Sequence, residues 1–248
     1  MTPCEQNECI YNGHRLIKLT PARPRGTLIW FHGGGWMIEL GEDSVAWGRD
    51  LAKATGLCVL MPDYPLAREW QYPRLNGWCS DCWRDLAQQS EISAPGPVLI
   101  GGDSAGAHLA LCALPARRPD AAIFVYPVTT LLPVRNMGSW NNFRRGWPLS
   151  PRLMDYFYDA YCPNQEDRLG ASPLEQLENI PPTLMITAGE DILADQQHAF
   201  AQRFSVSQKV YPTAHHIFLS REEGREHRAQ ALKDIAEGVK RFLEQGRF

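Results

Sequence analysis

The stretch that most constrains this chain runs from Val98 to Leu111 and reads VLIGGDSAGAHLAL. It opens as a short apolar run typical of a buried strand, breaks at two glycines, and resumes as a pattern of small and apolar residues typical of a helix. Ser104 therefore lies where a strand turns sharply into a helix. Gly102 and Gly106 flank it, as such a turn requires, because a side chain there would collide with the neighbouring strand and helix.

Gly102, Ser104 and Gly106 together form G-x-S-x-G, the pattern of a nucleophile elbow. Such short patterns also arise by chance, and a serine between glycines is usually an ordinary loop residue. Here the strand before it and the helix after it meet the structural requirement of the motif. We therefore interpret Ser104 as a candidate nucleophile, which requires a base, an acid and an oxyanion hole elsewhere in the chain.

Composition excludes several classes of protein. The 248 residues are 44% hydrophobic, which suits a full globular core. The net charge of -3 indicates no excess of positive charge for binding nucleic acid. No apolar run approaches the ~18 residues of a membrane span, and the first residues lack a signal-peptide pattern.

Seven scattered cysteines favour a reducing cytoplasm. The lone C-x-x-C at Cys79 and Cys82 lacks a second ligand pair, so we expect no metal site there.

A run of three glycines follows the expected strand Thr27–Phe31, within the sequence His32-Gly-Gly-Gly-Trp36. Backbone amides without side chains can approach a ligand oxygen closely, although a flexible turn would have the same composition. With an elbow in the same chain, this loop predicts one half of an oxyanion hole, and the residue after the serine supplies the other half. The candidate donors are Gly34 and Gly35, with Gly33 as an alternative, and Ala105. We expect His32 to brace the loop.

Strand and helix signals alternate along the chain and predict one α/β domain over residues 1–248. An Asn12-Gly13 hairpin precedes strands at 57–61, 121–127, 183–189 and 208–211, and helices are expected at 44–55, 73–89, 199–204 and 221–247. The alternation breaks at about 128–180, which we interpret as a cap over the site rather than a surface excursion. Within it, Ser150 and Pro151 predict the start of a helix that ends at Tyr161.

Candidate acids and bases follow the last two strands. Glu190, Asp191 and Asp195 come after the strand at 183–189, and His215 and His216 come after the final strand. Carboxyl ends of strands in an open α/β sheet are where site residues gather. The order nucleophile, acid, histidine is the one that α/β-hydrolases use. The residues alone leave open which acid and which histidine take part.

These motifs resemble those of the hormone-sensitive-lipase-like group of α/β-hydrolases, which includes bacterial carboxylesterases and acetylesterases. The segments at 32–36 and 102–106 match its two signatures, and those at 63–69 and 181–195 resemble its D-Y-x-L-A-x-E and acid segments. The resemblance implies an α/β-hydrolase fold, with a mostly parallel central sheet flanked by helices and a short cap. Because the chain begins close to the first hairpin, the N-terminal part of the usual cap is expected to be missing, which would open the acyl pocket or admit a bulky substrate from that side.

The resemblance also selects site residues. Its G-x-D register selects Asp191, and its H-G-F segment aligns on His216, Ile217 and Phe218, so His216 is preferred to His215. An isoleucine thus stands where a glycine is usual. The implied activity is that of a serine carboxylesterase that hydrolyses small, short-acyl esters through an acyl-enzyme on Ser104, with no metal or cofactor. Relatives often pair through the outer edge of the sheet, so a homodimer is one option.

Two alternatives stay open at this point. The segment from Ser104 to His108 also resembles the elbow of arylformamidases, which hydrolyse N-formylkynurenine, and the cap carries side chains that suit an aromatic, acidic substrate. Those side chains are Trp140, Arg144, Arg145 and Trp147. The other alternative is a binding module, because hydrolase-like plant gibberellin receptors keep the fold without the catalytic histidine. That histidine is present in this chain.

Overall fold

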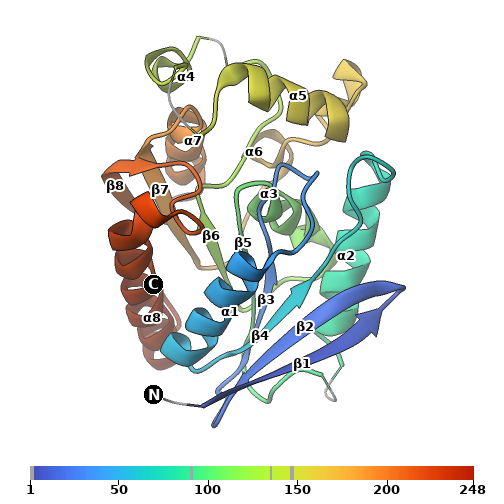
Figure 1. The fold of residues 1–248 in the computed structure, drawn as a ribbon, viewed down its shortest axis with the longest axis vertical. Helices are drawn as coiled ribbons and strands as arrows, with labels where there is room; N and C mark the ends of the chain where they lie inside the picture. Colours follow the sequence, from blue (N-terminus) through green and yellow to red (C-terminus); the bar gives the residue numbers. More distant parts are fainter. Residues whose placement is uncertain (1–2, 90–91, 135, 146–147) are drawn as a thin grey trace.

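Eight strands form a single sheet within residues 3–89, 92–134, 136–145 and 148–248, which the computed structural model describes (Figure 1). Their order across the sheet is β1-β2-β4-β3-β5-β6-β7-β8. The strands are β1 (Cys4–Tyr11), β2 (His14–Pro21), β3 (Thr27–Phe31), β4 (Cys58–Pro62), β5 (Val98–Asp103), β6 (Ala121–Val125), β7 (Thr183–Glu190) and β8 (Ser207–His215). All pairs from β4 to β8 are parallel, while β1 and β2 are antiparallel additions at one edge.

The antiparallel edge begins with the predicted hairpin. Asn12 and Gly13 connect β1 to β2 with φ of 45° and 82°, the left-handed backbone that a two-residue turn requires. β2 then pairs with β4, with Leu16 opposite Pro62. The hairpin thereby extends the parallel sheet by two strands at the side away from β8.

Helices cover both faces of the sheet. They are α1 (Glu42–Thr55), α2 (Arg74–Leu86), α3 (Ser104–Ala113), α4 (Gly138–Asn142), α5 (Pro151–Tyr161), α6 (Pro173–Gln176), α7 (Ala194–Phe204) and α8 (Arg225–Gln245), with short 3-10 helices at Leu114–Ala116, Gln165–Arg168 and Glu222–Gly224. One core lies under α1 and α8, and the other lies under α2, α3 and α7. In β3, Leu28 and Trp30 enter the first core while Ile29 and Phe31 enter the second, because successive strand residues point to opposite faces.

Several predicted element ends were wrong. The helix expected over 199–204 begins at Ala194, and the strand expected over 121–127 ends at Val125. The helix expected to reach Gln89 ends at Leu86, and the last strand continues past Tyr211 to His215. β8 is an edge strand in which most side chains are partly or fully exposed, so no apolar alternation marks its second half. Its length comes from pairing with β7, where Glu190 lies opposite His215 beyond an irregularity at residues 188–190. His216 is therefore the first residue after the strand.

Residues 128–180 contribute α4, α5 and α6, and the first two lie beyond the carboxyl ends of the parallel strands (Figure 1). The Ser150 hydroxyl accepts a hydrogen bond from the Leu153 amide, and Pro151 occupies the first helical position of α5, as predicted. Elsewhere, Gly56 ends α1 in a left-handed conformation at φ 72°. Among the described residues, no helix has the length and apolar character needed to cross a bilayer.

Candidate active site

Ser104 lies at the junction of β5 and α3 with φ of 51°, a left-handed backbone that non-glycine residues seldom adopt. A Cβ on Gly102 would come within 2.5 Å of the carbonyl oxygen of Phe31, and one on Gly106 would overlap the carbonyl oxygens of Phe31 and His32. Both flanking positions therefore exclude any side chain. This close approach to β3 is the physical reason for the G-x-S-x-G pattern.

Three side chains from distant parts of the chain form one hydrogen-bonded series. The Ser104 Oγ lies 2.8 Å from His216 Nε2, and His216 Nδ1 lies 2.6 Å from Asp191 Oδ2. A carboxylate only accepts hydrogen bonds, so Nδ1 carries the ring proton and Nε2 is left to accept the serine proton. Asp191 also accepts a hydrogen bond from the Leu193 amide at 3.0 Å, which orients its carboxylate. All three side chains are buried.

The structure does not bring the alternative candidates, Glu190, Asp195 and His215, to Ser104. Glu190 Oε2 faces His215 Nδ1 at 3.6 Å on the exposed end of the β7–β8 pair. Asp195, in the first turn of α7, accepts a hydrogen bond from the Ser139 amide of α4 at 2.9 Å. Within the ranges described, no group of three or more His, Cys, Asp or Glu side chains is arranged to hold a metal ion.

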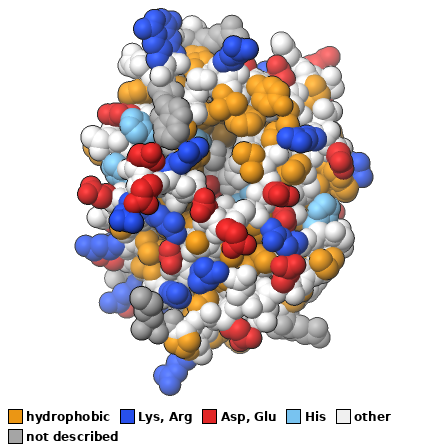
Figure 2. Space-filling model, in the orientation of Figure 1, with side chains coloured by type: hydrophobic (Ala, Val, Ile, Leu, Met, Phe, Trp, Pro, Cys, Tyr) orange, Lys and Arg blue, Asp and Glu red, His pale blue; other side chains and the backbone are white. Residues whose placement is uncertain are grey.

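A cavity of about 220 Å³ opens beside Ser104. Its lining residues come from the glycine loop, the elbow, the segment at 148–157 and the loop after β8: Gly34, Gly35, Trp36, Ile38, Ser104, Ala105, Val128, Pro148, Leu149, Leu153, Met154, Phe157, His216, Ile217 and Arg221. Most of these are apolar. Figure 2 shows hydrophobic side chains gathered over α5, beside a hollow in the upper half of that face. The site is thus a small, largely apolar cavity with a few polar atoms.

Gly34 and Gly35 line this cavity with left-handed backbones, at φ of 129° and 58°. A Cβ on Gly35 would lie 2.6 Å from the ring of Phe157 on α5. The amide of Ala105, the second residue of α3, has no acceptor within its own helix, since the first four amides of a helix never do. The expected oxyanion donors therefore lie around one cavity, with Gly33 as the exception.

Gly33 has a different partner. Its amide hydrogen-bonds to the Asp103 carboxylate, and a Cβ on Gly33 would overlap that carboxylate. It is not among the cavity-lining residues described above. Gly33 therefore differs from Gly34 and Gly35, because its amide faces the end of β5, and its role as an oxyanion donor stays a prediction.

Asp103 itself is held from two sides. The indole nitrogen of Trp30 donates to its Oδ1 at 3.0 Å, in addition to the Gly33 amide. Burial raises the pKa of Asp103 to about 6, while these hydrogen bonds and the nearby His216 act to lower it. Asp103, the residue before Ser104, therefore links the elbow to the glycine loop.

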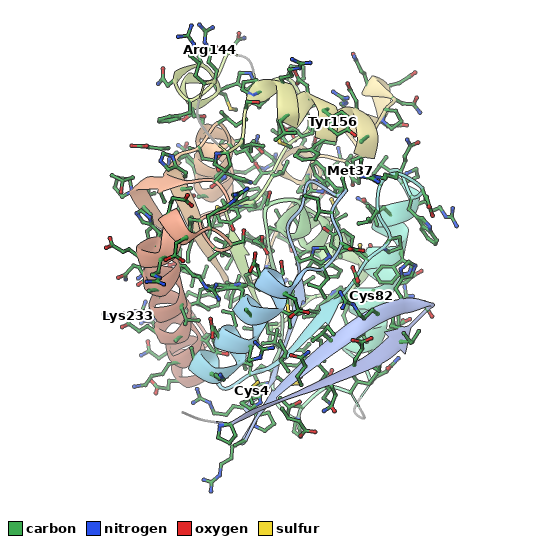
Figure 3. All side chains as sticks on the ribbon, viewed as in Figure 1. Cys4, Met37, Cys82, Arg144, Tyr156 and Lys233 are labelled. Carbon is green, nitrogen blue, oxygen red and sulfur yellow. The ribbon has the colours of Figure 1, made fainter. Side chains whose placement is uncertain are left out.

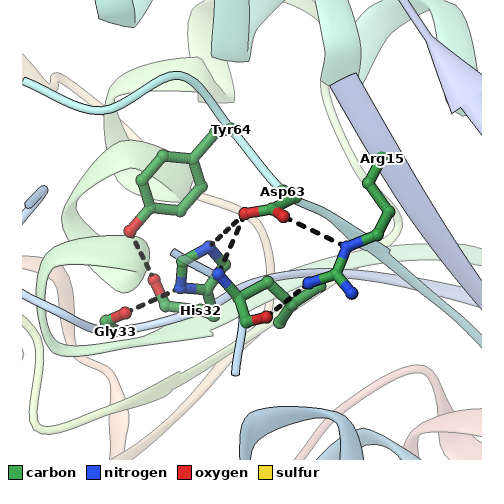
Figure 4. A network of polar contacts seen from close by, with 6 residues as sticks. Arg15, His32, Gly33, Asp63 and Tyr64 are labelled. Carbon is green, nitrogen blue, oxygen red and sulfur yellow. Dashed lines mark hydrogen bonds and ion pairs between the residues drawn. The ribbon is translucent and has the colours of Figure 1, made fainter. Parts of the chain in front are cut away.

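His32 braces the glycine loop through contacts with Gly33 and Tyr64 (Figure 4). Its Nδ1 lies 2.7 Å from the Gly33 carbonyl oxygen, its ring stacks on Tyr64 with centroids 4.3 Å apart, and the Tyr64 hydroxyl donates to the His32 carbonyl at 2.8 Å. Burial lowers the pKa of His32 to about 4, so the ring is neutral at pH 7. Asp63 Oδ1 accepts from the Leu40 amide at 2.9 Å, and its other oxygen pairs with Arg15. This agrees with the bracing role expected for His32.

Sequence reasoning missed the apolar wall formed by Leu153, Met154 and Phe157 of α5. Their spacing marks one helix face, but a stripe of this kind cannot distinguish packing from a cavity. Among the side chains considered for an aromatic substrate, Trp140 is buried, and Arg144 lies at the outer end of the molecule (Figure 3). Neither these two nor Arg145 belongs to the described lining of the cavity, and Trp147 lies outside the described residues.

Comparison with known proteins identifies the family. A family model described as the alpha/beta hydrolase fold matches residues 28–220, and the chain belongs to this family. The ethyl acetate hydrolase of Pseudomonas putida is 30% identical over 244 residues, covering 90% of this chain and 75% of that protein. An esterase of Fusarium pseudograminearum is 28% identical over 240 residues, covering 90% and 71%.

Among solved structures, carboxyl esterase 2 from Tuber melanosporum superposes with a TM-score of 0.85, covering 98% of this chain and 86% of that one at 22% identity. The predicted family and its mostly parallel, helix-flanked sheet are confirmed. The predicted class, a carboxylic ester hydrolase, is confirmed by the named relatives. These relatives give no support to the arylformamidase alternative or to a binding module.

Proposed function

We propose that the protein is a serine carboxylesterase that hydrolyses small esters through an acyl-enzyme on Ser104. The observation that carries this proposal is the series of hydrogen bonds from Ser104 through His216 to Asp191, at 2.8 and 2.6 Å, beside a cavity that Ser104 lines. Nucleophile, base and orienting acid are each within hydrogen-bond reach of the next, which is the geometry that acyl transfer requires.

In the acylation step, Ser104 Oγ bonds to the ester carbonyl carbon as His216 Nε2 takes the serine proton. Asp191 keeps the other ring proton on Nδ1 and stabilises the imidazolium that forms. The bond between the carbonyl carbon and the alcohol oxygen then breaks. Its electron pair leaves with that oxygen, which receives the proton from His216 Nε2.

In the second step, a water molecule replaces the alcohol. His216 takes a proton from this water as the water oxygen attacks the acyl carbon, and the same proton then returns to Ser104 Oγ as the acid is released. The serine is regenerated, so the cycle consumes only ester and water.

The amides of Gly34, Gly35 and Ala105 are the proposed oxyanion donors. They surround the same cavity as Ser104, and the N-terminus of α3 adds a partial positive charge. Negative charge develops on the carbonyl oxygen as it becomes tetrahedral. Losing one such donor costs about 3 kcal/mol of transition-state stabilisation.

A preference for short acyl groups fits the size of the cavity, about 220 Å³, and its apolar lining. It also fits the name of a relative, the ethyl acetate hydrolase of Pseudomonas putida. A series of p-nitrophenyl esters of increasing acyl length checks this preference. We expect kcat/KM to be greatest for the shortest acyl groups, and a maximum at long chains would contradict the assignment.

The test of the proposed function compares the wild-type protein with Ser104→Ala. The wild type should turn over p-nitrophenyl acetate and become labelled by a fluorophosphonate. The variant should keep its circular dichroism spectrum, lose labelling, and lose at least about a thousandfold in kcat. Full residual activity in Ser104→Ala would assign the reaction to another group. Turnover of N-formylkynurenine but not of acetate esters would replace the esterase proposal.

Residues 128–180 are proposed to act as the cap of a single domain. Leu149, Leu153, Met154 and Phe157, all within this segment, line the cavity beside Ser104. Replacing Met154 by Ala should therefore change KM for the ester more than it changes kcat, because an apolar contact to bound substrate is lost while the reacting groups stay in place.

We also propose a cytoplasmic location, because all seven cysteines are unpaired. Cys4 and Cys82 lie well apart (Figure 3), and burial raises the pKa of Cys79 and Cys82 well above the usual value, which keeps both thiols protonated. Cell fractionation tests the location. Pairing of two copies through an outer edge of the sheet is a further prediction, which analytical ultracentrifugation checks.

A further inference from the structure

Ile217, the residue after His216, has a left-handed backbone with φ of 57°. This conformation is strongly disfavoured for a β-branched residue, because its side chain crowds the backbone. It is also the position where the resemblance described above places a glycine. A strained conformation persists only where the surroundings impose it, and such strain gathers at functional sites.

The neighbours of Ile217 prevent its backbone from relaxing. His216 on one side is held between Ser104 and Asp191. On the other side, Phe218 is buried, with its ring centroid 5.1 Å from that of Tyr126. The Ile217 carbonyl oxygen also accepts a hydrogen bond from the Ser220 amide at 3.1 Å. The turn is fixed by these contacts, whichever residue occupies position 217.

The turn therefore does not require an isoleucine side chain at position 217. The Ile217 side chain lines the cavity that contains Ser104, next to His216. A branched apolar side chain at this point reduces the space available to a bound ester. A glycine would allow the same turn with less strain and more room.

The reaction indicates which part of the ester meets Ile217. This step rests on the proposed function, in which His216 Nε2 gives its proton to the leaving alcohol oxygen. That oxygen must come within hydrogen-bond reach of Nε2, so the alcohol portion of the ester lies on the histidine side of the cavity. The carbonyl oxygen lies on the other side, towards the amides of Gly34 and Gly35.

From these positions, we propose that Ile217 is a specificity-determining residue that limits the size of the alcohol portion of the ester. The substrates are then esters of small, unbranched alcohols. Bulky or cyclic alcohols are excluded by contact with the isoleucine side chain beside the reacting histidine.

The experiment measures kcat/KM for ethyl acetate, cyclohexyl acetate and ethyl hexanoate by titrating the acid released. The proteins are the wild type, Ile217→Ala and Ile217→Gly. Ser205→Gly is the control, because Ser205 has a similar left-handed backbone at φ 51° after α7 but does not line the cavity. The Ser205→Gly substitution therefore relieves backbone strain without enlarging the cavity.

In Ile217→Gly, the cyclohexyl-to-ethyl acetate ratio of kcat/KM should rise at least about tenfold, the scale set by removing a few methylene groups from a pocket wall. Ile217→Ala should change the ratio in the same direction, because the bulk of the side chain is responsible. The ratio of ethyl hexanoate to ethyl acetate should change less than about twofold in both variants. Ser205→Gly should leave both ratios at the wild-type values.

An unchanged alcohol ratio in both Ile217 variants would overturn the proposal, and so would an acyl ratio that rises as much as the alcohol ratio. A shift in Ser205→Gly equal to that in Ile217→Gly would assign the effect to backbone strain instead. Failure of the proposed function is a separate result: the wild type would neither turn over ethyl acetate nor be labelled by a fluorophosphonate.

Discussion

The indole nitrogen of Trp30 donates a hydrogen bond to the Asp103 carboxylate across 3.0 Å. Trp30 belongs to β3 and Asp103 ends β5, the adjacent parallel strand. The same carboxylate receives the Gly33 amide, from the loop that follows β3. One buried acid thus connects the two loops that the proposed mechanism needs in fixed relation, the one that carries the serine and the one that carries the oxyanion donors.

Replacing Trp30 by Phe should remove this donor while keeping most of the apolar volume. We expect a loss of about 1–3 kcal/mol in the free energy of unfolding, because the Asp103 carboxylate loses a buried partner. The pKa of Asp103 should rise further above about 6, since the indole hydrogen bond acts to lower it. Urea denaturation at pH 7 measures the stability change. Trp47→Phe is the matched control, because the buried Trp47 indole nitrogen finds no acceptor among the described residues.

Replacing Asp191 by Asn should reduce kcat by about a thousandfold to ten-thousandfold, with the protein still folded. An amide at this position favours the wrong ring tautomer of His216 and no longer stabilises its charged form. Steady-state assays with p-nitrophenyl acetate measure the effect. Glu190→Gln provides the comparison, because it alters the adjacent carboxylate, which faces His215 instead. Equal losses in the two variants would contradict the choice of Asp191.

Replacing Gly35 by Ala should impair both stability and activity. The new Cβ would lie 2.6 Å from the Phe157 ring, and the backbone has φ of 58°, which costs about 1–2 kcal/mol for an L-residue. The loop must shift to relieve the contact, which displaces a proposed oxyanion donor, so kcat should fall as well. Thermal unfolding and ester turnover measure the two effects.

Gly77→Ala serves as the control for that substitution. Gly77 lies exposed within α2, and a Cβ there meets nothing within 4 Å. The change should raise stability by about 0.5–1 kcal/mol, because alanine favours a helix over glycine, and should leave turnover unchanged. A destabilised Gly77→Ala, or an unaffected Gly35→Ala, would contradict this account of the glycine loop.

Stability should depend on pH through His108 of α3. Burial lowers the pKa of this histidine from 6.5 to about 4, so the folded protein keeps it neutral where the unfolded chain is protonated. The stabilisation is present above pH 6.5 and is lost as the pH falls towards 4, by about 3 kcal/mol. His108→Gln should therefore show a smaller loss of unfolding free energy between pH 6.5 and 4 in urea titrations. An equal loss in both proteins would rule out His108 as the source.

Most of the local structure was determined by the sequence alone. The β5–α3 junction, the Asn12-Gly13 turn and the Ser150 cap of α5 were all predicted, because each depends on neighbouring residues and on the backbone that glycine, asparagine or proline allows. The end of β8 could not be predicted, since its second half is defined by pairing with β7 rather than by its own alternation.

The composition of the site was decided only by the tertiary structure. Glu190 and Asp191 are neighbours in sequence, as are His215 and His216, but one member of each pair points to solvent and the other towards Ser104. A single residue along a strand end reverses the direction of a side chain, and local patterns do not report which direction leads to the serine. For the same reason, only the folded chain shows that the Gly33 amide faces Asp103 and that Ile217 lines the cavity.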